Sequence, residues 1–161
     1  MKTLRVEPLT KDAFKPFGDV LEVENSDSFY INDKSCQRFN ALGNVTVTDD
    51  ANPSFSIIKA VAFTEKLTFS LLEKHPLGSQ AFYPLDGKKF IVIVAEGDDE
   101  IDETTLRAFM TNGEQGVNYY KNVWHYLLFA WNEDTDFITI DRAGKDNCIV
   151  NNLSKEYTVL L

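Results

Sequence analysis

The sequence has only two cysteines and two histidines among its 161 residues. Cys36 and Cys148 are far apart, so they form neither the paired spacing of a zinc site nor a disulfide framework. Isolated thiols are typical of proteins in a reducing compartment. We therefore expect a cytoplasmic protein whose stability depends on its hydrophobic core and not on cross-links.

Long hydrophobic runs are also missing from the chain. No segment approaches the roughly 18 consecutive apolar residues of a membrane-spanning helix. The first residues, Met1–Glu7, lack the apolar core of a secretory signal peptide. These absences predict a soluble protein with no membrane partner.

Basic residues are outnumbered, with 16 lysines and arginines against 25 aspartates and glutamates, which gives a net charge of −9. Nucleic acids and anionic membranes bind basic surfaces, so this charge argues against both as partners. A small anionic substrate is compatible with the sequence if its pocket is locally positive.

Helical periodicity is nearly absent, whereas short runs of β-branched and aromatic residues recur along the chain. Phe90–Ala95 is apolar throughout, which predicts a central strand covered on both faces. Thr10–Phe14 predicts one short helix or turn near the N-terminus, and Asn112–Gly113 is the strongest hairpin-turn signal. The sequence therefore predicts a single all-β domain over residues 1–161, a sandwich or barrel of short strands.

The segment Glu24–Lys34 is rich in Asn, Ser and Asp, which predicts a loop. Phe29, Tyr30 and Ile31 lie inside it. Because loops normally carry polar side chains to the surface, these three residues indicate that the loop packs against another surface.

His75 begins the first of two segments that carry candidate chemistry. It precedes a Pro-Leu-Gly turn, which leads to Gln80 and Phe82. On one strand, Gln80 and Phe82 would share a face, so an amide and an aromatic ring would line the same surface. The alternative is that His75 is a half-solvated turn residue and Phe82 belongs to the core.

His125 ends the second segment, and polar residues are concentrated just before it. An inward-facing neutral imidazole is a natural general acid or base near pH 7. The alternative is a core histidine bonded to the backbone. The neighbouring candidates for the site are Asn118, Lys121, Asn122 and Trp124.

Arg107 and Arg142 are the remaining candidates, because each interrupts a strand-like run. An arginine fork can hold a substrate carboxylate by two parallel hydrogen bonds. Arg142 could equally pair with Asp141 on an outer face.

A metal site would usually need about three imidazoles and a carboxylate, and the chain has two histidines. Two histidines with Gln80 or a carboxylate such as Glu73 would make only a weak site. From the residues alone we expect no metal ligands and no required cofactor.

Several blocks of the sequence resemble the ureidoglycolate lyase family, long called ureidoglycolate hydrolases. The similarity runs from about Leu4 to Asn147 and is densest from His75 to Arg142. The blocks are Glu73-Lys-His-Pro-Leu-Gly-Ser-Gln-Ala-Phe82, Leu106-Arg-Ala-Phe-Met-Thr-Asn-Gly-Glu-Gln-Gly-Val-Asn-Tyr119, Asn122-Val-Trp-His125, Phe129-Ala-Trp131 and Asp136-Phe-Ile-Thr-Ile-Asp-Arg142.

The resemblance implies a cupin-like β-barrel of mainly antiparallel strands, a homodimer, and the cleavage of ureidoglycolate into glyoxylate and urea in allantoin breakdown. It also implies nickel as a possible cofactor. The chain departs from the family at one point, where Tyr126–Leu127 replaces the His-Pro that commonly follows the Trp-His pair.

The reaction needs one base, one acid and an anchor for a carboxylate. We expect His75 and His125 to act as the acid and base, with Gln80 and Asn122 holding the ureido group or hydroxyl. Arg107, Lys121 or Arg142 would offset the carboxylate's charge, and Lys121 is also a catalytic candidate. The competing hypotheses are a cupin that binds a small carboxylate without turnover, as a sensor or carrier, and a metal-dependent oxygenase or isomerase.

Overall fold

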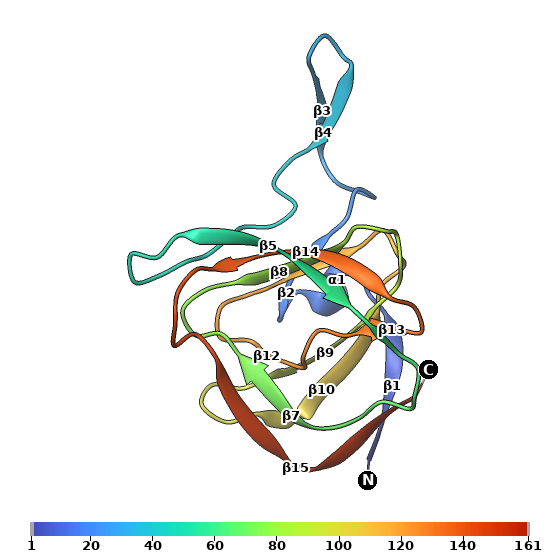
Figure 1. Ribbon diagram of the computed structural model, residues 1–161, viewed down its shortest axis with the longest axis vertical. Helices are drawn as coiled ribbons and strands as arrows, with labels where there is room; N and C mark the ends of the chain where they lie inside the picture. The colour runs from blue at the N-terminus through green and yellow to red at the C-terminus, as the bar shows by residue number, and fades with distance from the viewer. Residues whose placement is uncertain (1, 161) are drawn as a thin grey trace.

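A computed structural model describes residues 2–160 as an all-β protein with one helix of four residues (Figure 1). The first elements are β1 (Lys2–Pro8), α1 (Lys11–Phe14), β2 (Gly18–Leu21), β3 (Ser28–Ile31), β4 (Cys36–Phe39), β5 (Pro53–Ala60), β6 (Ala62–Phe63) and β7 (Thr68–Lys74). They are followed by β8 (Gln80–Pro84), β9 (Ile91–Glu96), β10 (Asp102–Met110), β11 (Gly116–Tyr119), β12 (Trp124–His125), β13 (Ala130–Trp131), β14 (Thr135–Arg142) and β15 (Ile149–Leu160). The all-β fold expected from the sequence is confirmed.

Two large sheets form most of the body. A closed barrel has the strand order β1-β10-β9-β12-β7-β15, and a five-stranded sheet has the order β2-β11-β8-β14-β5. Most strand pairs are antiparallel, although β1 runs parallel to both β10 and β15. The five-stranded sheet lies against the outside of the barrel, so the molecule has one core inside the barrel and another between the two sheets.

β9 contributes to both cores, because alternate side chains of a strand point to opposite faces. Ile91, Ile93 and Ala95 belong to the barrel core, whereas Val92 and Val94 belong to the core between the sheets. All five side chains are buried. The central strand expected over Phe90–Ala95 is thus confirmed, although the strand itself begins at Ile91.

The short helix α1 also agrees with the sequence. The Thr10 side chain accepts a hydrogen bond from the backbone N–H of Ala13 at 3.2 Å, which is the expected capping contact. Phe14 is fully buried in the core between the sheets. No helix within residues 2–160 is long and apolar enough to cross a membrane.

The prediction of a hairpin at Asn112–Gly113 was wrong. The chain does bend at Gly113, which has a φ of 98°, but β10 and β11 belong to different sheets. β10 pairs with β1 and β9, whereas β11 pairs with β2 and β8. Turn chemistry specifies a local reversal, and the partners of each strand are decided by the packing of the whole chain.

The loop predicted over Glu24–Lys34 was also wrong in part, because β3 lies inside it and pairs with β4. These two strands, which we call the arm, project from the body beside the five-stranded sheet (Figure 1). Phe29, Tyr30 and Ile31 are exposed on the arm. Within the part of the chain that the structure describes, the arm's strands pair only with each other.

Candidate active site

Glu73, His75 and His125 form one cluster at the edge of the space between the two sheets. Glu73 on β7 and His125 on β12 are direct partners in the barrel wall, and His75 follows the end of β7. The imidazole Nε2 atoms of His125 and His75 lie 3.6 and 3.9 Å from Glu73 Oε1. One potential ligand atom from each residue lies within 4.8 Å of the other two.

Backbone hydrogen bonds determine how both imidazoles face this cluster. Nδ1 of His75 lies 2.5 Å from the carbonyl of Asn147, and Nδ1 of His125 lies 3.0 Å from the carbonyl of Val123. A carbonyl oxygen only accepts, so each Nδ1 carries a proton and each Nε2 is the ring nitrogen that faces Glu73. Both Nε2 atoms are buried and have no hydrogen-bond partner within residues 2–160.

His125 is held in its neutral form. It is only 2% exposed, and burial lowers its pKa from 6.5 to about 3, with the nearby His75 acting in the same direction. The ring of Tyr119 stacks on the His125 ring at 4.2 Å. Burial and the charge of Glu73 raise the pKa of the Tyr119 hydroxyl, so that side chain stays protonated.

Gln80 extends this polar surface on the five-stranded sheet. It is the register partner of Tyr119, so the two side chains share the inner face. Its Nε2 donates to Asp141 Oδ2 at 3.3 Å. Gln80 Oε1 and the nearby Thr139 Oγ1 are both buried without a hydrogen-bond partner among the described residues.

Comparison with known proteins assigns the chain to a family. A family model described as ureidoglycolate lyase matches residues 1–160. Curated proteins named ureidoglycolate lyase from Escherichia coli O1:K1 and Shigella boydii serotype 18 are each 49% identical over 153 residues. The matched region covers 95% of this chain and 96% of each relative. The chain belongs to the ureidoglycolate lyase family.

The cluster of this family member fits a divalent metal ion. Two imidazoles and one carboxylate are suitable ligands for nickel, zinc or iron. Metal-binding histidines usually donate their other ring N–H to a carbonyl or carboxylate, as both histidines do here. The two unpartnered Nε2 atoms are the observation that supports this fit.

Cys148 lies beside the cluster, and its Sγ donates to Glu73 Oε2 at 3.5 Å. Burial and the charge of Glu73 raise the pKa of this thiol. Sequence reasoning assigned no site role to Cys148, Thr139 or Asp141. The signal that could have found the last two is the alternation of Phe137, Thr139 and Asp141 on one face of β14.

Two of the expected binding residues are packed in the cores. Phe82 is buried in the core between the sheets, two residues from Gln80 on the same face. Trp124 is fully buried in the barrel core, on the face opposite to His125. Its Nε1 donates to the carbonyl of Asp98, and the Lys74 ammonium lies 4.7 Å from its ring. These contacts give Trp124 a structural position and not one beside the histidines.

The polar residues that precede His125 in the sequence lie in different places. Asn118 lies on the outer face of its sheet, where its Nδ2 donates to Asp19 and to the carbonyl of Asn44. The backbone N–H of Asn122 donates to the carbonyl of His75 at 2.9 Å, which helps to position that histidine. The side chain of Lys121, in the same turn, is exposed.

The two arginines are engaged elsewhere. Arg107 and His125 both pair with Val94 and therefore share a face, but the Arg107 guanidinium donates to both oxygens of Glu7 and to the carbonyl of Ala13. Arg142 donates to the carbonyls of Thr48 and Lys145. Neither guanidinium is directed at the histidine cluster.

Tyr126 and Leu127 also lie outside the cluster. The Tyr126 ring packs on Phe69 with ring centroids 5.1 Å apart, on the side of the barrel core. Leu127 is exposed. The departure from the family at these positions therefore does not remove a group from the space between Glu73, His75 and His125.

Proposed function

We propose that this chain cleaves ureidoglycolate into glyoxylate and urea, as a carbon–nitrogen lyase of allantoin breakdown, at the cluster of Glu73, His75 and His125. The observation that carries the proposal is the pair of imidazoles whose unpartnered Nε2 atoms converge on one carboxylate. Family membership supports the same activity, because the relatives named above are ureidoglycolate lyases.

The substrate carries a carboxylate, a hydroxyl and a ureido nitrogen on one carbon. Loss of the hydroxyl proton allows the glyoxylate carbonyl to form while the carbon–nitrogen bond breaks and the leaving nitrogen takes up a proton. No water is consumed. In the protein without metal, His75 and His125 can exchange these protons through Nε2, because each Nδ1 is already bonded to a carbonyl.

The same three side chains would hold the divalent cation, nickel, that the family resemblance implies. When bound, such a cation supplies Lewis-acid polarisation of a substrate oxygen. The chain's own residues orient the substrate: Gln80 faces the ureido group, and the stacked Tyr119 ring fixes His125 in place.

Lys121 is the basic residue that we assign to the substrate carboxylate. Arg107 and Arg142 already donate to Glu7 and to backbone carbonyls. Lys121 is exposed in the turn whose next residue, Asn122, bonds to His75. A flexible ammonium at this position can reach a carboxylate at the mouth of the site.

Turnover of purified protein tests the proposal directly. We expect ureidoglycolate to yield equal amounts of urea and glyoxylate. His125→Ala should lower kcat at least 100-fold, whereas Lys59→Ala, which removes only an exposed ion pair with Asp136, should leave it unchanged. Tight binding of ureidoglycolate without urea release would instead identify a sensor or carrier.

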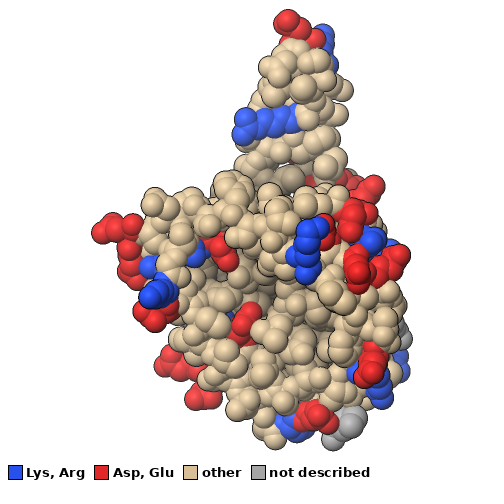
Figure 2. All heavy atoms as spheres, viewed as in Figure 1, with Lys and Arg blue, Asp and Glu red and all other residues tan. Residues whose placement is uncertain are grey.

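We also propose that the protein is a cytoplasmic homodimer in which the arm binds a second copy of the chain. Both cysteines are free and exposed, which suits a reducing compartment. An isolated two-stranded hairpin is marginally stable in water, yet the arm exposes Phe29 and Tyr30, at 48% and 60%. Figure 2 shows the arm standing clear of the body with mostly uncharged atoms on its visible surface.

A second apolar surface lies on the outer face of the five-stranded sheet. Phe55 and Ile57 on its edge strand are 72% and 57% exposed. Their partners across β14 are Ile140 and Ile138, and a groove of about 330 Å³ lies between this face and the loop after β4. One two-fold axis would bury both surfaces at once, each arm on the partner's sheet. Because each copy carries a charge of −9, these neutral surfaces are where two copies can approach.

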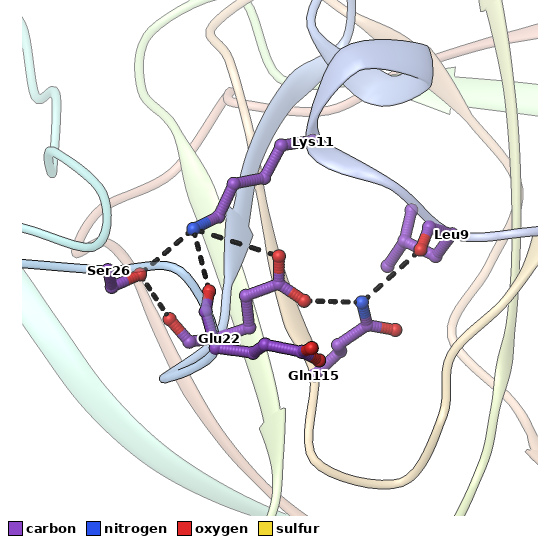
Figure 3. Close-up of polar contacts among 6 residues, drawn as sticks. Leu9, Lys11, Glu22, Ser26 and Gln115 are labelled. Carbon is purple, nitrogen blue, oxygen red and sulfur yellow. Dashed lines mark hydrogen bonds and ion pairs between the residues drawn. The ribbon is translucent and has the colours of Figure 1, made fainter.

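The segment that leads into the arm, Glu22–Ser26, is bonded to the body. These bonds hold the arm in place, so that it can contact a partner. Lys11 Nζ donates to Ser26 Oγ at 2.9 Å and to the carbonyl of Glu24 at 3.2 Å (Figure 3). Gln115 Nε2 donates to Glu22 Oε2 at 2.6 Å and to the carbonyl of Leu9. Residues from α1 and from the turn before β11 thus hold the segment that leads into β3.

A further inference from the structure

A row of polar side chains crosses the inner face of the five-stranded sheet. Asp141 on β14 accepts a hydrogen bond from Gln80 on β8, and Gln80 lies opposite Tyr119 on β11. Tyr119 in turn stacks on His125 at 4.2 Å. The row therefore leads from Asp141 to the candidate catalytic cluster.

Asp141 determines which way the amide of Gln80 faces. An ionised carboxylate only accepts hydrogen bonds, so the NH₂ end of the amide must point toward Asp141, and it does so at 3.3 Å. The carbonyl oxygen Oε1 then faces away from Asp141. It is buried, and within residues 2–160 no group donates to it.

A buried acceptor without a donor costs stability, so its retention needs an explanation. Thr139 Oγ1, two residues from Asp141 on the same face of β14, is buried and unpartnered in the same way. An acceptor and a hydroxyl on one surface match the two ends of a ureido group, which offers N–H donors and a carbonyl acceptor.

We propose that Asp141 is a positioning residue that orients Gln80 so that Oε1 accepts an N–H of the substrate's ureido group, while Thr139 donates to the ureido carbonyl. The inference rests on the proposed lyase function and names the part of the site that recognises the leaving group. It makes the site selective for a ureido group over a ligand that carries only a carboxylate and an aldehyde.

The test compares the binding of two ligands to the wild-type protein and two variants. N-carbamoylglycine carries the ureido and carboxylate groups without the reactive hydroxyl, and glyoxylate lacks the ureido group. Calorimetry would measure the binding of both to the wild-type protein, to Asp141→Asn and to Gln80→Met. We expect each substitution to weaken N-carbamoylglycine about tenfold and to leave glyoxylate binding within twofold.

The double variant separates positioning from an independent contribution. If Asp141 acts through Gln80, adding Asp141→Asn to Gln80→Met should cost no further affinity for N-carbamoylglycine, because coupled residues are not additive. Asp141→Glu keeps a carboxylate, which only accepts, whereas the Asn amide can also donate and so no longer fixes the orientation of Gln80; Asp141→Glu should therefore retain more affinity than Asp141→Asn. Effects that multiply in the double variant, or an equal loss of glyoxylate binding, would overturn the proposal.

Failure of the lyase function would be distinguishable from failure of this inference. Absence of urea release by the wild-type protein contradicts the proposed activity, whereas these binding measurements require no turnover. Thermal unfolding of each variant provides the folding control. Thr139→Val is a second test of how the ureido group is recognised. It removes the hydroxyl while keeping the shape and should weaken N-carbamoylglycine alone.

Discussion

His125 and Glu73 face one another directly across two paired strands of the barrel, β12 and β7, and His125 Nε2 lies 3.6 Å from Glu73 Oε1. Paired residues share a face of a sheet, so this pairing brings the Glu73 carboxylate to the His125 imidazole. The two residues are 52 positions apart in the sequence. His75, just beyond Glu73, completes the cluster from the same strand end.

Glu73→Gln tests whether the cluster binds a metal. The amide keeps the shape of the carboxylate but loses its charge, so we expect nickel affinity to fall at least tenfold and kcat/KM to fall at least 100-fold. Elemental analysis after equilibration with nickel and a turnover assay would measure the two effects. Asp136→Asn is the matched control, because that carboxylate forms an exposed ion pair with Lys59. Unchanged nickel affinity in Glu73→Gln would contradict a metal site at this cluster.

The assignment of the carboxylate anchor predicts opposite results for two basic residues. Lys121→Met should raise KM about tenfold, because it removes the charge that we place beside the substrate carboxylate. Arg107→Met should leave KM nearly unchanged and lower the free energy of unfolding, because its guanidinium is bonded to Glu7 and the carbonyl of Ala13. Steady-state kinetics and urea unfolding measure these effects, and a larger rise in KM for Arg107→Met would reverse the assignment.

Burial of His125 predicts how stability depends on pH in the metal-free protein. Its pKa is lowered from 6.5 to about 3 in the folded state, so the unfolded chain binds the proton first as the pH falls. The stability is fully present above pH 6.5 and is lost between pH 6.5 and 3, by at most about 1.4 kcal/mol per pH unit. His125→Gln should reduce this slope. Urea unfolding between pH 7 and 5 measures it, and equal slopes in both proteins would refute the prediction.

The proposed interface predicts that the arm controls assembly. Light scattering of the wild-type protein should give the mass of two chains. The double substitution Phe29→Ser and Tyr30→Ser should raise the dimer dissociation constant at least 100-fold, because it removes two exposed aromatic anchors. Val150→Ser is the control, since Val150 is an exposed apolar residue on the barrel strand β15. A variant that remains dimeric would place the interface elsewhere.

Much of the architecture follows from local patterns in the sequence. The apolar run Phe90–Ala95 predicted a strand buried on both faces, and Thr10 predicted the cap of the short helix, as observed. The pair Asn112–Gly113 predicted the turn but not its role, because a turn signal contains no information about which strands will pair. Phe29, Tyr30 and Ile31 indicated a packing surface, yet their own body does not cover them.

The candidate site was likewise predicted only in part from the sequence. Sequence motifs selected His75, His125 and Gln80, which the fold brings to one surface. They also suggested Arg107, Asn118 and Arg142, whose polar groups are bonded to other partners. The type of a residue indicates which chemistry it can perform. Whether its polar atoms are free depends on contacts with distant parts of the chain.

The sequence alone established the fold class, the family and the acidic charge, and it made the two histidines candidates for the chemistry, because these depend on composition, periodicity and motifs. The three-dimensional fold was needed to show that Glu73 joins the histidines, that Gln80 donates to Asp141, and that both arginines bond to other groups. The physical reason is strand pairing: register across β7, β12, β9 and β10, and across β14, β8 and β11, sets which side chains share a face, and no local pattern encodes that register.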